Sequence, residues 1–94
     1  MMIRYKSCQA FLKVEEDEDT GESYLILHNL DSKYQGLGHG TEVLRLVREY
    51  SNAQGLEVRC HPYALNGDHD RLRAWYERNG FLDDGEWFVY WPKR

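Results

Sequence analysis

The sequence predicts a mixed α/β fold, in which a twisted sheet of about five strands carries two helices. Short apolar runs alternate with two amphipathic runs, at 41–53 and 70–79. Gly-containing turns at 19–21 and 83–85 separate pairs of apolar runs, as in hairpins. One helical run lies between the strands expected at 23–30 and 56–62. This order implies a parallel strand pair joined by a right-handed crossover.

The composition fits one small globular domain, residues 1–94. Hydrophobic residues make up 41% of the chain, with three Trp, seven Tyr and three Phe, which is enough for a core. The net charge of −4 disfavours non-specific binding to nucleic acid. No apolar run approaches the ~20 residues of a membrane span, and the first residues lack the apolar core of a signal peptide. We therefore expect a cytoplasmic protein with no membrane or nucleic-acid partner.

The first half of the chain reads as a hairpin. Residues 3–14 alternate as one strand, with Cys8 and Ala10 on one face. The segment 15–22 has six acids in eight residues and is expected to be a solvated loop; the alternative is an acidic lip that attracts a cationic amine. Cys8 and Cys60 lack the spacing of a metal site, so no metal is expected and both are interpreted as reduced, buried thiols.

Each helix has a single apolar stripe, and the first is followed by a glycine that suits a left-handed position, Gly55. The third strand, 56–62, is expected to place Val58 and Cys60 on one face and Arg59 on the other. The chain closes with a hairpin at 81–91. The stripe residues are Val43, Leu44, Val47 and Tyr50 in the first helix, and Leu72, Trp75 and Tyr76 in the second.

The stretch with the clearest functional signal is Gln35-Gly36-Leu37-Gly38-His39-Gly40-Thr41, which is expected to form a glycine-rich turn between a strand and a helix. Such a turn directs bare backbone N–H groups and a positive helix end toward one point, where an anion such as phosphate fits. A Rossmann fingerprint fails at Thr41, and a Walker A loop fails because no lysine lies nearby. The pattern Q/R-x-x-G-x-G/A fits, through Gln35, Gly38 and Gly40.

This pattern resembles the acyl-CoA pyrophosphate loop of the GNAT superfamily of N-acetyltransferases. A second stretch, Trp-Tyr-Glu-Arg-Asn-Gly-Phe at 75–81, resembles the end of the last helix in that family. Together they cover the chain from about residue 24 onward. The resemblance implies a truncated GNAT fold that takes acetyl-CoA as acyl donor and passes the acetyl group to a primary amine by direct attack.

The resemblance also implies roles for individual residues. Tyr76 would give a proton to the departing thiolate, and the backbone of Leu30 would meet the pantetheine arm and polarise the thioester carbonyl. Asn66 would bond the arm, although it lies further from Tyr76 than the family pattern has it. The pyrophosphate would be held by the side chain of Gln35 and the amides of Gly36, Leu37, Gly38, His39, Gly40 and Thr41.

The sequence does not identify the general base. The aligned region offers Glu22, Tyr24 and His28, and His28 is preferred because it shares a strand face with Leu30 and histidine titrates close to neutral pH. His61 is a second choice, and a water relay a third. Each assignment has a plain structural alternative: His28 as a hydrogen-bonded histidine, Tyr76 as a core aromatic, and the glycine turn as a simple reversal.

The family has a further strand and two helices ahead of this hairpin, which form a wall of the acceptor pocket. Only about twenty residues precede Tyr24, so the sequence predicts a short form without them. A homodimer could supply the missing wall. Two functions follow as alternatives: an N-acetyltransferase whose acceptor is a small molecule or a protein, and a non-catalytic CoA-binding or protein-interaction module.

Overall fold

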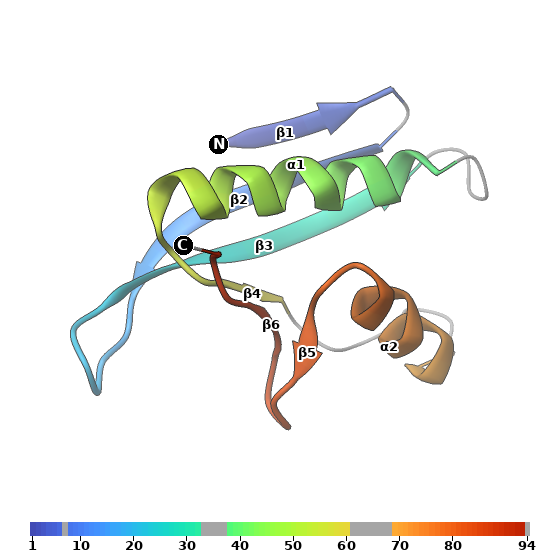
Figure 1. Cartoon of the computed structure of the whole chain (residues 1–94). Helices are drawn as coiled ribbons and strands as arrows, with labels where there is room; N and C mark the ends of the chain where they lie inside the picture. Colours follow the sequence, from blue (N-terminus) through green and yellow to red (C-terminus); the bar gives the residue numbers. More distant parts are fainter. Residues whose placement is uncertain (7, 33–37, 61–68, 94) are drawn as a thin grey trace.

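The computed structural model describes residues 1–6, 8–32, 38–60 and 69–93, with the backbone alone at 29–32 and 69. These residues form a six-stranded mixed sheet with two helices, in strand order β1-β2-β3-β4-β6-β5 (Figure 1). The predicted mixed α/β class is confirmed, with six strands where about five were expected. The elements are β1 (Met2–Tyr5), β2 (Cys8–Glu16), β3 (Ser23–Ser32), α1 (His39–Gln54), β4 (Val58–Cys60), α2 (His69–Arg78), β5 (Leu82–Asp83) and β6 (Phe88–Tyr90).

The additional strand comes from a reversal near the N-terminus. The chain turns at Lys6, which has a φ of 50°, and β1 pairs antiparallel with β2 so that Tyr5 lies opposite Cys8. The single strand predicted at 3–14 is therefore wrong. The prediction placed Tyr5 and Cys8 on opposite faces of the sheet, whereas the pairing places their side chains on the same face. No Gly, Pro or Asn marks this turn, so the alternating pattern runs through it without a break.

The crossover from β3 to β4 follows the prediction. β3 and β4 are parallel, with Leu25 opposite Val58 and Leu27 opposite Cys60. The connecting helix α1 begins at His39, two residues earlier than predicted, because Gly38 caps it with a left-handed φ of 77°. Gly55 ends the helix at φ 69° as expected, and its N–H donates to a carbonyl of the last turn.

One face of the sheet carries the core, and both helices pack on it. Strand register places Leu12, Leu27 and Cys60 side by side on this face. In the described part of the chain no helix covers the opposite face, where Phe11 is 39% exposed. The buried core consists of Cys8, Ala10, Leu12, Leu25, Leu27, Val43, Leu44, Val47, Val58, Cys60, Tyr76, Phe81, Phe88 and Tyr90.

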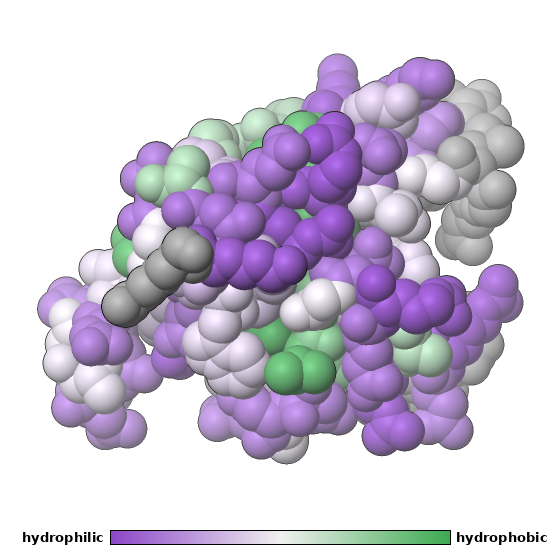
Figure 2. Space-filling model, viewed as in Figure 1, coloured by the Kyte–Doolittle hydropathy of each residue, from purple (hydrophilic) through white to green (hydrophobic). Residues whose placement is uncertain are grey.

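Both cysteines are buried thiols and neither forms a disulfide, as predicted. The view in Figure 2 shows a mostly hydrophilic surface with a small apolar patch. Neither of the described helices has the length and apolar character needed to span a membrane.

Candidate functional site

β3 runs beyond the described part of β4. The described pairing of the two strands reaches Leu27 and Cys60, after which the structure describes no residue before 69, and β3 continues to Ser32. On its other side β3 remains paired with β2 as far as Ser32 opposite Cys8. Among the described residues, the edge of 28–32 that faces β4 therefore has no partner strand. Such an edge can bind an extended ligand through main-chain hydrogen bonds, as an added strand does.

A bulge in β3 lies in this stretch of the strand. The β2–β3 register shifts between Gln9 and Phe11, so that Ala10 of β2 stands opposite two residues of β3, Asn29 and Leu30. A bulge turns the backbone groups that follow it and increases the local twist. Leu30, whose backbone was predicted to meet the thioester, thus belongs to the irregular point of the strand. The role itself remains a prediction.

Tyr76 lies beside Cys60, the last described residue of β4. Its phenol oxygen accepts a hydrogen bond from Sγ of Cys60 at 3.2 Å, and its ring stacks on Phe88 with 4.9 Å between centroids. Burial raises the pKa of Tyr76 above its ordinary value, and burial also raises the pKa of Cys60, to about 11. Both groups therefore keep their protons at neutral pH, and the Tyr76 hydroxyl still has its own proton to donate while its oxygen accepts from Cys60. With 4% of the residue exposed, this fits a proton donor inside a closed site and equally a core aromatic.

The described part of the glycine turn contains Gly38 and the first turn of α1. No side chain caps the helix, and the first N–H groups of a helix have no intrahelical acceptor. Gly40 also has a packing role, since a Cβ there would stand 3.2 Å from Cζ2 of Trp75. The indole Nε1 of Trp75 donates to Oγ1 of Thr41 at 3.4 Å. The fold alone therefore explains why Gly38 and Gly40 are glycines. Their presence does not require that an anion binds.

The β1–β2 turn adjoins the same helix end. The ring of Tyr5 meets that of His39 edge to face, with 5.8 Å between centroids, and the Lys6 ammonium is 5.5 Å from the centroid of Tyr5. The ring of Tyr5 thus connects the Lys6 ammonium to His39, the first residue of α1. Sequence reasoning missed Lys6 and Tyr5, because the turn that brings them here contains no Gly, Pro, Asn or Asp.

The structure does not bring His28 and Tyr76 together. His28 is paired with Phe11, which places it on the face opposite Tyr76. It is partly buried and lines a hollow of about 450 Å³, together with Phe11 and Lys13. Gly38, His39, Gly40 and Thr41 do not line that hollow. The remaining predicted residues, Gln35, Gly36, Leu37, His61 and Asn66, lie outside the residues that the structure describes.

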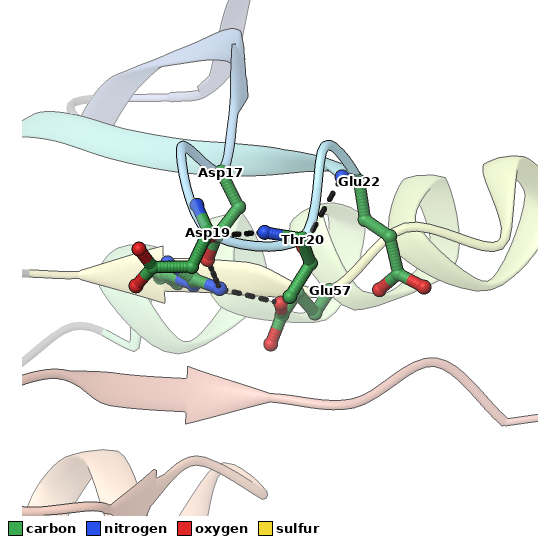
Figure 3. A network of polar contacts seen from close by, with 6 residues as sticks. Asp17, Asp19, Thr20, Glu22 and Glu57 are labelled. Atoms are coloured by element: carbon green, nitrogen blue, oxygen red, sulfur yellow. Dashed lines mark hydrogen bonds and ion pairs between the residues drawn. The ribbon is translucent and has the colours of Figure 1, made fainter.

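The acidic hairpin folds back onto β4 (Figure 3). Oδ2 of Asp17 lies 3.1 Å from Nη2 of Arg59, which also meets Glu57 at 2.9 Å. The N–H of Asp19, followed by Arg59, lowers the pKa of Asp17 below its ordinary value. The guanidinium of Arg59 lies 3.9 Å above the ring centroid of Tyr24. Part of the acidic charge is therefore neutralised within the fold, and the acidic-lip interpretation remains untested.

No family model matches the chain, and no curated protein matches it. The predicted membership of the GNAT superfamily is therefore wrong. It depended on two short motifs, and the structure gives packing reasons for residues of both. The comparisons support a likeness of fold instead: the crystal structure of the anti-CRISPR protein AcrVA5 matches with a TM-score of 0.76 and 18% sequence identity, over 96% of each chain.

Proposed function

We propose that this protein binds acetyl-CoA and transfers the acetyl group to a primary amine. One observation carries the proposal: the β3 edge beyond Leu27, for which the described residues supply no β4 partner, precedes the N-terminus of α1 at Gly38. The pantetheine arm of acetyl-CoA carries amide groups that can pair with such a strand edge. The diphosphate of acetyl-CoA can bind at such a helix N-terminus. Each charge-assisted N–H bond contributes ~1.5–3 kcal/mol, and three or four of them are compatible with micromolar affinity.

The reaction needs only a few groups from the protein. A neutral amine attacks the thioester carbonyl carbon, a C–N bond forms and the C–S bond breaks. The backbone N–H of Leu30 would stabilise the developing negative charge on the carbonyl oxygen. Tyr76 would protonate the leaving thiolate; its raised pKa keeps the phenol protonated but also makes it a weaker acid, which opposes this step. The proton lost by the amine would go through water to solvent, because His28 lies on the opposite face of the sheet.

A non-catalytic CoA-binding module is the second candidate. The 4% exposure of Tyr76 favours it, since a phenol closed off in the core would not reach a substrate. The sheet face without a described helix favours it as well, because an acceptor pocket needs a wall. Both candidates place the protein where acetyl-CoA is available, which agrees with a cytoplasmic location and with two unbridged thiols.

Thermal unfolding with acetyl-CoA tests both candidates at once. Ligand at 100 times Kd stabilises by about 2.7 kcal/mol, which raises the Tm of so small a domain by on the order of 10 °C. Release of free thiol is then measured with small amines, lysine peptides and proteins as acceptors. Because AcrVA5 is an anti-CRISPR protein, CRISPR effector proteins belong among the acceptors. Stabilisation without turnover favours the module, and an unchanged Tm rules out both.

A further inference from the structure

A second hollow, of about 340 Å³, lies between α1, the end of α2 and the segment that follows β6. Three cationic residues line it, one from each of these segments: Arg48, Arg78 and Lys93. Two aromatic residues, Tyr90 and Trp91, also line it, and 51% of Trp91 is exposed. We call this hollow the basic cleft.

Hydrogen bonds fix the frame of the basic cleft. Nη1 of Arg48 donates to the carbonyl of Asn79 at 2.7 Å, which ties α1 to the end of α2. The backbone N–H of Lys93 and the hydroxyl of Tyr90 both donate to Oδ1 of Asn52, at 2.7 and 2.9 Å. The chain beyond β6 is thereby held against α1. A site built in this way needs little reordering when a ligand enters.

The charge of the basic cleft is not neutralised by described residues. No carboxylate lines it, and none of the ion pairs within the described segments involves Arg48, Arg78 or Lys93. Two other cations of the helices are paired with carboxylates: Arg45 lies between Glu42 and Glu49, and Arg73 lies 3.9 Å from Glu77. A chain with a net charge of −4 therefore gathers three cations around one hollow.

We propose that the basic cleft docks a short acidic segment of a partner protein. Carboxylates of the segment would pair with Arg78, Lys93 and the remaining donors of Arg48, and an apolar side chain beside them would pack on Trp91. A lone inorganic anion would leave the indole unused. A nucleic acid is disfavoured, because the cations surround a compact hollow instead of following a backbone path, and because the net charge is negative.

A fluorescently labelled peptide of alternating Asp and Glu with one central Leu tests this proposal by anisotropy. We expect saturable binding that weakens with added salt. The double variant Arg78→Ala/Lys93→Ala should weaken it about tenfold, since each exposed charge pair contributes modestly. The matched control is Lys13→Ala/Arg45→Ala, which removes the same charge outside the basic cleft and should bind as the parent does. Thermal unfolding of both variants checks that they remain folded.

Several outcomes would overturn the proposal. Absence of peptide binding is one, and equal weakening by both double variants is another, because the effect would then be general electrostatics. Tighter binding of a thymidine oligonucleotide or of CoA, with the same dependence on Arg78 and Lys93, would assign the basic cleft to that ligand. Self-association lost in the cleft variant would assign it to the acidic hairpin of a second copy.

Discussion

Trp75 of α2 lies against Gly40 of α1, with its Cζ2 atom 3.2 Å from the place where a Cβ on that glycine would stand. Its indole N–H also donates to the hydroxyl of the next residue, Thr41. The two helices therefore meet at the first turn of α1. Tyr76, the neighbour of Trp75, is carried by the same helix. Gly40, Thr41 and the candidate proton donor thus belong to one packed unit.

Replacing Gly40 with Ala should destabilise the protein. The new methyl group would press on the indole, which is held by Thr41, and such overpacking typically costs about 1–3 kcal/mol. For a domain of this size each kcal/mol lowers Tm by roughly 4–8 °C. Thermal unfolding followed by circular dichroism measures this shift.

The matched control uses the smaller ring of Trp75→Phe. In that background Gly40→Ala should cost clearly less, because the contact that it violates has gone. An equal loss in both backgrounds would mean that Gly40 is needed for its backbone and not for the indole.

The sequence predicted the elements that have strong local signals. The stripe containing Val43 and Val47 and the left-handed Gly55 describe α1 correctly, and the run around Leu25 predicts a central strand. The turn at Lys6 was missed because a lysine with positive φ has no sequence signature.

The site was less predictable than the fold. The contact of Gly40 with Trp75 joins residues far apart in the sequence, as does the bond from Cys60 to Tyr76. A glycine motif does not tell whether a glycine is needed for its backbone freedom or for the close approach of a ligand. At Gly40 the structure shows a different reason, which is packing against Trp75. The β3 bulge depends on pairing with β2, which the residues of β3 alone do not encode.

Asp17→Asn should lower the Tm at neutral pH, because it removes the ion pair with Arg59 that ties the hairpin to β4. The folded state lowers the pKa of Asp17 below its ordinary 3.8. A lowered carboxyl pKa stabilises the fold above the unfolded pKa, and this stabilisation is lost as pH falls through the folded value. The Tm difference between parent and variant should therefore be constant near neutrality and shrink below pH 3.8.

Glu18→Gln is the control, since Glu18 lies in the same hairpin and is in no ion pair with a described residue. It should leave the Tm near that of the parent. A Tm difference for Asp17→Asn that persists unchanged at acidic pH would assign the effect to lost backbone hydrogen bonds and not to charge.

Lys6→Gln should weaken acetyl-CoA binding if the helix end at Gly38 holds its diphosphate. The ammonium lies at the ring of Tyr5, which contacts His39 in the first turn of α1. An exposed ion pair contributes ~0.2–1 kcal/mol to binding, which corresponds to roughly a twofold to fivefold change in Kd. Isothermal titration at low and high salt measures it, and the difference from the parent should shrink at high salt. Lys13→Gln, on β2, should bind as the parent does; equal effects of both variants would contradict a local role for Lys6.

Tyr76→Phe separates a proton donor from a core aromatic. Phenylalanine keeps the stacking on Phe88 and removes only the hydroxyl that Cys60 contacts, so the fold and acetyl-CoA binding should be largely retained. If the phenol protonates the thiolate, turnover should fall by about 10²–10⁴. Tyr90→Phe is the counterpart, because it removes a buried hydroxyl that donates to Asn52, with a stability loss of about 0.5–1.5 kcal/mol. It should leave turnover unchanged, and equal rates in parent and Tyr76→Phe would assign Tyr76 to the core alone.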